Sequence, residues 1–302
     1  MTFERKGVEE FLLADFQRLV KSVRASNPIF FISGGEPFMR ADILDIVAAV
    51  AAAGLRCMIN TNGAQISARQ ITALAKFPLQ AVIFSLYGPE DLHDTITGVP
   101  GSYARTVAAI SDFHRQREKT RLILSTTVLS ETVAHLPHLI EFVKSLGVDR
   151  VKIEHLNFLT TEEQLAQNEY CARTPAAAAR TMTLERPSLF ARAAAEHIRY
   201  NLARIKQKFG NYILIKPLLD AHGLREWYTA APPTRQRCHF VLHSLFVRPN
   251  GEISPCPFLT DCGIGSIAEK DIRQIWRQRT YRELQIFLAH GKLPLCHRCC
   301  KR

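Results

Sequence analysis

The first half of the chain alternates short apolar runs with longer amphipathic segments. Five runs have the length and composition of buried strands, at residues 28–33, 56–60, 81–86, 121–128 and 151–155. Between them, apolar residues recur at helical spacing over residues 40–53, 68–76, 102–117 and 136–146. Gly54 and Gly147 follow two of these helices, and glycine is favoured just after a helix end. The alternation predicts parallel strands joined by crossover helices.

The pattern changes after the fifth strand. Residues 159–235 are rich in alanine and arginine, with alternating charges and several prolines, which indicates a helical insertion or linker. Further on, residues 240–247 are expected to enter a β-hairpin that turns at Asn250-Gly251, because Asn-Gly between apolar runs is typical of tight turns. A helix over residues 272–288 follows. We therefore expect three parts, at residues 1–158, 159–235 and 236–302.

Composition narrows the class of protein. The 302 residues include 39 Lys and Arg against 28 Asp and Glu, a net charge of +11, and 47% are hydrophobic, which excludes a disordered chain. Acidic residues such as Glu9 and Glu10 break up the N-terminus, which does not resemble a signal peptide. The most apolar stretch, residues 43–54, is much shorter than the roughly 20 residues of a membrane span. We expect a cytoplasmic protein without a membrane partner.

Six of the eight cysteines lie in the last 65 residues. Clustered cysteines in a chain without a secretory signal bind metal more often than they form disulfides. Cys238 and Cys256 bracket the hairpin with 17 residues between them, and Cys296 and Cys299 form a C-x2-C pair on one turn. Four thiolates suit tetrahedral zinc or an iron–sulfur cluster, and spacing does not separate the two.

The other four cysteines are less informative. Cys57 lies on an apolar strand and Cys171 in the insertion, where free buried thiols are expected. Cys262 and Cys300 are undecided, since each is either a spare metal ligand or a bystander.

Motifs in both halves resemble one family. Gly34-Gly35-Glu36-Pro37 at a strand end, then Thr61-Asn62-Gly63 and SLYGPEDLHDTITGVPGSY from residue 85, resembles the core of radical S-adenosylmethionine (radical SAM) enzymes. The pattern C-x12-G-x4-C from Cys238 to Cys256, then IGSIAEKDIRQIW and C-x2-C, resembles their SPASM/twitch auxiliary-cluster domain. The resemblance covers about residues 28–158 and 238–300.

The resemblance implies an α/β fold. We expect a partial (β/α)6 TIM-like barrel that lacks its first strand, a helical insertion, and a small cysteine-rich domain with a β-hairpin. The loop Gly34-Gly35-Glu36-Pro37 is expected to bind the methionine amino group of S-adenosylmethionine, and Ser85 its ribose. One [4Fe–4S] auxiliary cluster is expected on Cys238, Cys256, Cys296 and Cys299.

Plainer interpretations stand beside these roles. The glycines could form a tight turn, with Pro37 starting a helix and Glu36 as an acid favoured near its first turn. His93 and Asp94 could be an acid–base pair, but helix caps and surface contacts are the more common use of such loop residues. His239, His243 and His297 flank the cysteines and could each replace a thiolate, although structural roles are expected.

One departure from the family pattern stands out. The superfamily holds its first [4Fe–4S] cluster on C-x3-C-x2-C upstream of the Gly-Gly-Glu-Pro loop, but residues 1–56 contain no cysteine. Either the chain begins at an internal methionine, which we favour, or it is a degenerate member. We expect the chain as written not to cleave S-adenosylmethionine reductively, and a second cluster only in an N-terminally extended form.

The leading hypothesis is a radical SAM oxidoreductase or maturase. Such an enzyme makes a 5′-deoxyadenosyl radical and abstracts hydrogen from a peptide or cofactor-precursor substrate, with flavodoxin or ferredoxin as reductant. The alternative is a non-catalytic zinc or iron–sulfur module that contacts nucleic acid or a partner protein, given the basic charge. A third reading is an inactive, partner-dependent homologue. Because Lys and Arg are spread along the chain, we expect solvated helix faces and no nucleic-acid partner.

Overall fold

A six-stranded sheet forms the centre of the first part of the chain. The computed structural model describes residues 10–173, 192–229, 237–259, 262–290 and 293–300. The strands are β1 (Ile29–Ile32), β2 (Arg56–Thr61), β3 (Ala81–Ser85), β4 (Arg121–Val128), β5 (Arg150–His155) and β6 (Ile213–Lys216). They follow each other in chain order across the sheet, and β1 to β4 pair in parallel. The predicted α/β class is confirmed.

The sixth strand corrects the sequence interpretation. β6 lies next to β5, within the stretch that was expected to be a helical insertion or linker. Three of its four residues, Ile213, Leu214 and Ile215, are apolar, and Pro217 directly follows Lys216. So short a run after a long charged helix is easily missed by periodicity, which needs a longer window to separate strand from helix.

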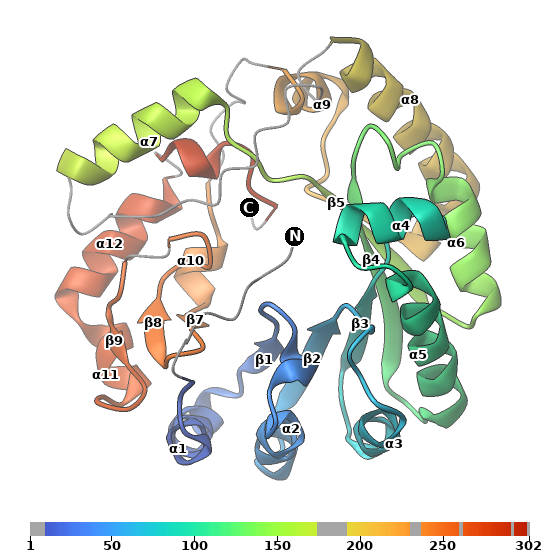
Figure 1. The fold of residues 1–302 in the computed structure, drawn as a ribbon. Coiled ribbons are helices and arrows are strands. Elements are labelled where there is room, and N and C mark those ends of the chain that lie inside the picture. Colours follow the sequence, from blue (N-terminus) through green and yellow to red (C-terminus); the bar gives the residue numbers. More distant parts are fainter. Residues whose placement is uncertain (1–9, 174–191, 230–236, 260–261, 291–292, 301–302) are drawn as a thin grey trace. The chain divides into compact units, whose positions relative to one another are not determined.

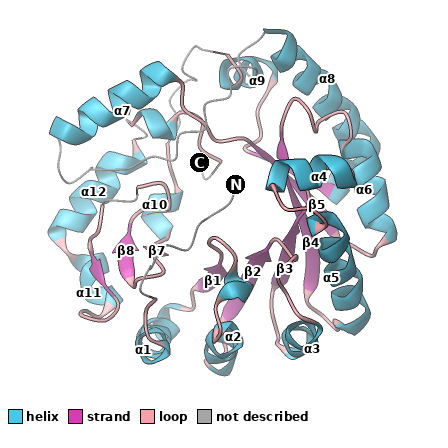
Figure 2. Cartoon of the chain, in the orientation of Figure 1, coloured by secondary structure: helices cyan, strands magenta, loops and turns pink. Residues whose placement is uncertain are grey.

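Helices cover one face of this sheet (Figures 1 and 2). They are α1 (Leu13–Val23), α2 (Ile43–Ala52), α3 (Ala68–Lys76), α5 (Ser102–Gln116), α6 (Leu136–Ser145) and α8 (Arg192–Phe209). Another helix, α4 (Glu90–Thr97), packs against α5. On β4 the buried residues Leu122, Leu124 and Val128 alternate with half-buried Ile123 and others, as expected for a strand with one packed face. The less buried face is therefore the one on which polar side chains of the strands gather.

One connection differs from expectation. The segment with His93 and Asp94 was expected to be a loop, but it forms helix α4. Gly98 ends this helix in the left-handed conformation, at φ 69°. Gly54 and Gly147, at φ 72° and 80°, also take the conformation expected after a helix end.

A second compact unit contains most of the remaining chain. The first unit comprises mainly Phe16–Glu154 and Asn201–Ile215, and the second mainly His155–Tyr200 and Lys216–Arg302 with Gly7–Asp15. The second holds α7 (Thr161–Arg173), α9 (Ala221–Trp227), α10 (Phe240–His243), α11 (Ile272–Arg277) and α12 (Arg279–Ala289). It also holds a three-stranded antiparallel sheet of β7 (Phe246–Val247), β8 (Glu252–Ser254) and β9 (Gly265–Ser266).

Two details of the C-terminal prediction are wrong. The hairpin exists as β7 and β8, but Phe240–His243 is a helical turn rather than the start of a strand. The single helix expected over residues 272–288 is broken at Gln278, whose ψ of 135° is extended, so that α11 and α12 are separate. Short 3-10 helices lie at Arg24–Ser26, Pro37–Met39, Gly210–Tyr212 and Pro294–Cys296. In the described ranges, no helix is both long enough and apolar enough to span a bilayer.

Candidate functional site

The loop after β1 leaves open space beside a carboxylate. Gly34 has φ 153°, which side chains rarely adopt, and a Cβ added at Gly34 or Gly35 would meet no atom within 4 Å. Glu36 caps the following 3-10 helix by accepting a 3.1 Å hydrogen bond from Phe38 N–H, and Pro37 occupies the first helical position. The loop is thus a tight turn, and its glycines also leave room for a ligand to approach the backbone.

Glu36 is tied to the loop after the neighbouring strand. Thr61 Oγ1 donates to Glu36 Oε1 at 2.7 Å, and Asn62 N–H donates to Glu36 Oε2 at 2.7 Å. Burial raises the pKa of Glu36, and the hydrogen bonds from Asn62, Thr61 and Phe38 oppose that shift. The carboxylate is therefore held rigidly, and a cation beside it would favour its charged form.

The Thr61-Asn62-Gly63 loop is itself well ordered by polar contacts. Gly63 N–H donates to Thr61 Oγ1 at 3.0 Å, and Thr106 Oγ1 on α5 donates to the Asn62 carbonyl at 2.7 Å. The sequence identified this loop as a motif but did not indicate that Thr61 is a partner of Glu36. The available clue was that parallel neighbouring strands end at the same edge of the sheet.

Ser85 ends β3 beside further polar side chains. It stands in register with Ser125 of β4, whose Oγ donates to Glu154 Oε2 on β5 at 3.2 Å. Lys152 Nζ lies 2.8 Å from the same Glu154 oxygen. Burial raises the pKa of Tyr87, a hydrogen bond with Ser85 lowers it, and the Glu154 charge raises it further. Ser125, Lys152 and Glu154 were missed, although polar residues at alternate positions of apolar strands are a detectable clue.

The structure favours a capping role for Asp94. Its carboxylate accepts hydrogen bonds from Gly101 N–H at 2.5 Å, Ser102 Oγ at 2.8 Å and Tyr103 N–H at 2.8 Å, which ties α4 to the start of α5. His93 is buried, stacks on Tyr87 and accepts a 3.3 Å hydrogen bond from Tyr87 N–H through Nδ1. The capping alternative is thus confirmed for Asp94, and burial lowers the pKa of His93.

Most of the predicted metal ligands meet around one apolar cluster of the second unit. Cys238, Cys256 and Cys296 belong to it, together with Cys262 and the side chains of Leu259, Leu288, Leu293 and Leu295. Cys299 is buried on the same C-terminal segment but outside this cluster. Cys300 contacts Asn157: its N–H donates to Asn157 Oδ1 at 3.0 Å, and its sulfur accepts from Asn157 Nδ2 at 3.4 Å.

The chemical type of these ligands and their apolar surroundings both suit a soft metal centre. The thiolates of cysteine are soft ligands, of the kind that zinc and iron–sulfur clusters prefer. Within the described residues, however, no three His, Cys, Asp or Glu side chains already converge as a metal site. The donor chemistry therefore fits an iron–sulfur or zinc centre, while the set of ligands that closes on it stays a prediction.

The remaining cysteines and histidines are placed as follows. Cys57 is 1% exposed on β2 and burial raises its thiol pKa to about 12, so the expected free buried thiol is confirmed. The side chain of Cys171 lies outside the described part of the structure. His239 and His243 are exposed at α10, and His297 Nδ1 lies 3.4 Å from Glu163 Oε1. Glu163 and Arg298, which form a buried ion pair, were not anticipated from sequence.

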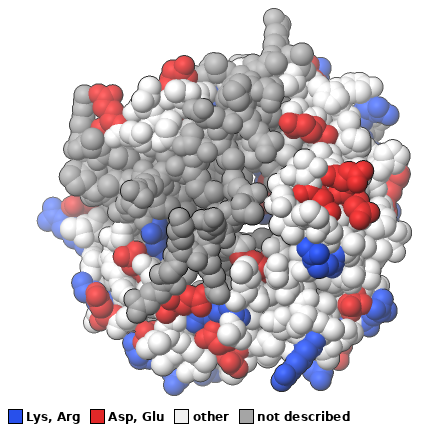
Figure 3. All heavy atoms as spheres, viewed as in Figure 1, with Lys and Arg blue, Asp and Glu red and all other residues white. Residues whose placement is uncertain are grey.

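Charge is mixed on the surface seen in Figure 3. Basic and acidic side chains of the described residues lie interspersed there, and no continuous basic patch is visible on that face. This distribution agrees with solvated helix faces, on the side of the molecule that the figure displays.

Two family models match the chain. The model of the radical SAM superfamily matches residues 4–153, and that of the SPASM iron-sulfur cluster-binding domain matches residues 238–300. The protein belongs to the radical SAM superfamily and carries a C-terminal SPASM iron–sulfur cluster-binding domain. The resemblance seen in the motifs is thus confirmed.

Individual relatives share less than 30% sequence identity with this chain. An AdoMet-dependent heme synthase of Oleidesulfovibrio alaskensis is 24% identical over 261 residues, which is 84% of this chain but only 63% of the relative. A PqqA peptide cyclase of Ruegeria pomeroyi is 29% identical over 128 residues, 42% of this chain and 34% of the relative. The crystal structure of Streptococcus suis SuiB bound to S-adenosylmethionine shares the fold at TM-score 0.67 and 17% identity, covering 97% of this chain and 67% of SuiB.

Proposed function

We propose that this protein is a radical SAM maturase component that binds S-adenosylmethionine at the β1 loop and one [4Fe–4S] auxiliary cluster in its C-terminal domain. Its substrate is a peptide or a cofactor precursor. The observation that carries the proposal is the Glu36 carboxylate, held by three protein donors beside the open Gly34-Gly35 backbone in a chain of this superfamily. The heme synthase and peptide cyclase relatives support the two substrate classes.

The β1 loop supplies the oxygen acceptors that an ammonium group needs. The carbonyls of Gly34 and Gly35 and the carboxylate of Glu36 hold the methionine amino group, and Pro37 fixes the backbone that presents Glu36. Because the loop is already ordered by Thr61 and Asn62, little conformational freedom is lost on binding. Ser85, at the end of β3, contacts the ribose. Bound S-adenosylmethionine together with an iron–sulfur centre supplies one-electron chemistry.

The auxiliary cluster is held by Cys238, Cys256, Cys296 and Cys299. Three of these thiols surround an apolar cluster of leucines, and such surroundings exclude water and influence the cluster's potential. Cys262 and Cys300 are not assigned as ligands. Since no cysteine precedes Cys57, the chain offers no C-x3-C-x2-C motif, and we expect no reductive cleavage of S-adenosylmethionine by these 302 residues alone. Electrons reach the cluster from a flavodoxin or ferredoxin.

Metal analysis tests the cluster part of the proposal. After anaerobic reconstitution, the full chain is expected to hold about four iron and four sulfide ions, as one [4Fe–4S] cluster requires. Cys238→Ala, Cys256→Ala, Cys296→Ala and Cys299→Ala should each lower that content, whereas Cys57→Ala, at a buried thiol far along the sequence, should not. Stoichiometric zinc without sulfide would overturn the iron–sulfur assignment and favour a zinc module.

Calorimetric titration tests the proposed binding site for S-adenosylmethionine. S-adenosylmethionine should bind the intact chain, with weaker affinity for Glu36→Gln because the substituted amide presents a donor where an acceptor is needed. Glu131→Gln is a matched control, since Glu131 is exposed and lies in a different loop. Equal affinity of both variants and the wild type would contradict the proposed binding site.

A further inference from the structure

A fully buried arginine lies between the two cysteines of the C-terminal C-x2-C pair. Arg298 follows His297 and precedes Cys299, and its side chain is 0% exposed. Burying a guanidinium removes its hydration and strongly destabilises the fold unless the charge is paired and its donors are satisfied. The contacts of Arg298 therefore show what holds this turn in place.

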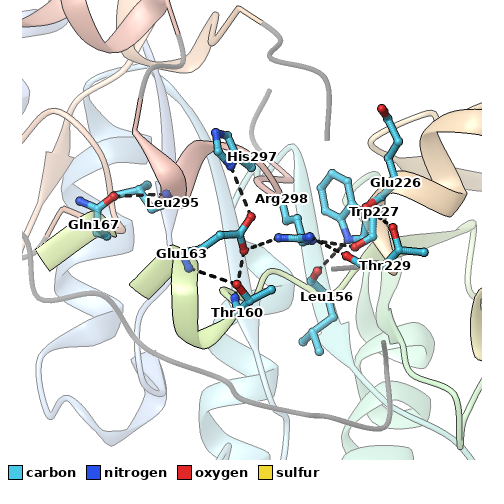
Figure 4. Close-up of polar contacts among 10 residues, drawn as sticks. All are labelled: Leu156, Thr160, Glu163, Gln167, Glu226, Trp227, Thr229, Leu295, His297 and Arg298. Carbon is cyan, nitrogen blue, oxygen red and sulfur yellow. Dashed lines mark hydrogen bonds and ion pairs between the residues drawn. The ribbon is translucent and has the colours of Figure 1, made fainter. Parts of the chain in front are cut away.

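Arg298 reaches three separate hydrogen-bonding partners (Figure 4) and, in addition, an aromatic ring. Its Nε donates to the Trp227 carbonyl at 2.7 Å, and Nη2 donates to the Thr229 carbonyl at 2.8 Å. Nη1 pairs with Glu163 Oε2. The guanidinium also lies 4.6 Å from the centre of the Phe158 ring, a cation–π distance. Contacts in several directions fix both the position and the plane of the side chain.

Glu163 is just as constrained. It is 9% exposed at the first turn of α7, where Thr160 N–H donates to Oε2 at 2.9 Å and Glu163 N–H donates to Thr160 Oγ1 at 3.1 Å. This reciprocal capping box fixes the carboxylate to the helix start. Burial alone would raise the pKa of Glu163, but hydrogen bonds from His297, Arg298 and Thr160 lower it overall, so the ion pair persists.

Two further hydrogen bonds hold the C-terminal segment on either side of Arg298. Leu295 N–H donates to Gln167 Oε1 on α7 at 3.3 Å, and Gln167 is buried. Beyond the cysteines, Cys300 N–H donates to Asn157 Oδ1 at 3.0 Å. The backbone that carries Cys296 and Cys299 is thus anchored before, between and after them, and Arg298 is the central anchor.

We propose that Arg298 is the positioning residue of this turn. Through its ion pair with Glu163 it fixes the backbone between Cys296 and Cys299, and the balance of the two charges sets the reduction potential of the cluster that these cysteines hold. The inference rests on the proposed iron–sulfur function. Outer-shell groups of this kind orient metal ligands, and the net charge near a cluster shifts its potential.

The charges of Glu163 and Arg298 predict the direction in which the reduction potential of the cluster should change in a variant. Glu163→Gln keeps the shape of the side chain but leaves the permanently charged Arg298 unbalanced, and nearby positive charge favours the reduced, more negative cluster. The potential should therefore shift to a more positive value, measured by redox titration followed by electron paramagnetic resonance. Arg298→Met should release iron to a chelator about 10-fold faster or more, and Arg298→Lys should restore part of the loss.

An exposed pair in the same unit gives the matched control. Arg279 Nε lies 2.8 Å from Glu283 Oε1, with side chains 91% and 60% exposed. Glu283→Gln and Arg279→Met should leave potential and iron release at wild-type values. Circular dichroism checks folding, and if Arg298→Met does not fold, Glu163→Gln and Arg298→Lys still decide the question.

The results of these measurements distinguish the positioning role of Arg298 from the proposed iron–sulfur function. A wild-type cluster whose potential and iron release are unchanged in folded Glu163→Gln and Arg298→Lys overturns the positioning role of Arg298 but not the proposed function. Zinc without sulfide in the wild type overturns the iron–sulfur function, and the rate of zinc release from the variants then decides whether Arg298 positions the turn. A wild type that takes up neither metal overturns both.

Discussion

Thr61 Oγ1 donates a 2.7 Å hydrogen bond to Glu36 Oε1 and, together with the bond from Asn62 N–H to Oε2, joins the loop after β1 to the end of the neighbouring strand β2. Thr61 is buried, so its hydroxyl has this defined acceptor rather than bulk water. The bond preorganises the Glu36 carboxylate. If Glu36 moved away, the buried Thr61 hydroxyl would lose its acceptor. Stability and ligand binding at this edge of the sheet should therefore change together when the bond is removed.

Thr61→Val should destabilise the protein by about 1 to 2 kcal/mol, because it leaves Glu36 with one charged hydrogen bond fewer. Urea unfolding measures the change, and calorimetric titration should show weaker binding of S-adenosylmethionine. Thr72→Val is the control, since the Thr72 hydroxyl is exposed and bonds only within α3. Identical stability of the two variants would show that the bond between Thr61 and Glu36 contributes nothing.

Gly34 and Gly35 should respond differently to alanine. Gly34→Ala forces a side chain to adopt φ 153°, which should cost about 1 to 3 kcal/mol. Gly35→Ala places its methyl group in open space and should change the unfolding free energy by less than about 0.5 kcal/mol. The same Gly35→Ala methyl should nevertheless weaken S-adenosylmethionine binding, and wild-type affinity would contradict close approach of the ligand to this backbone.

Gly63→Ala should be more damaging than Gly54→Ala, although both positions have positive φ, at 76° and 72°. A Cβ at Gly63 would lie 2.9 Å from Phe84 Cδ1, and Phe84 is completely buried, whereas a Cβ at Gly54 meets nothing within 4 Å. The overpacking should add about 1 to 3 kcal/mol beyond the shared backbone strain. Thermal unfolding of the two variants measures the difference, and equal melting temperatures would mean that Phe84 moves freely.

Asp149→Asn should lower stability near neutral pH and lose that effect in acid. The Arg117 guanidinium, which donates to both carboxylate oxygens, lowers the pKa of Asp149, and Leu122 N–H donates at 2.7 Å. A lowered folded-state pKa stabilises the fold above the unfolded value of about 3.9 and ceases to do so as pH falls through the folded value.

The size of this effect is limited by solvent. Asp149 is 42% exposed, so screening should reduce the difference from wild type to about 0.5 to 1 kcal/mol at pH 7. Urea unfolding at pH 7, 5 and 3 should show the two proteins converging toward pH 3. Asp112→Asn is the control, since its partner Arg115 on α5 is 68% exposed whereas Arg117 is 12% exposed. A pH-independent difference for Asp149→Asn would argue against the charge as its source.

Sequence predicted the features that depend on local pattern. Alternating burial places β2, β4 and β5 where the apolar runs lie, and the helix-ending glycines follow from their conformational freedom. Local pattern also locates the Gly-Gly-Glu-Pro loop at a strand end. It failed for β6, which is too short for its period to be distinguished, and for α4, whose polar sequence looked like a loop.

Partners distant in sequence could not be predicted at all. Glu163 and Arg298 are 135 residues apart, and each looks like an ordinary surface charge in its own segment. Nothing local distinguishes the buried Arg298 from Arg279 in the same domain, which is almost fully exposed. The same holds for Glu154, because only the sheet order places it beside Ser125.

The long separation of Glu163 and Arg298 also bears on how the protein is made. Their ion pair closes a loop of 135 residues, a contact that a growing chain cannot form until Arg298 has been synthesised. Contacts between such remote segments form late in folding, because a large loop entropy must be overcome first. The C-x2-C turn therefore acquires its fixed place only after the long connection between Glu163 and Arg298 has been closed.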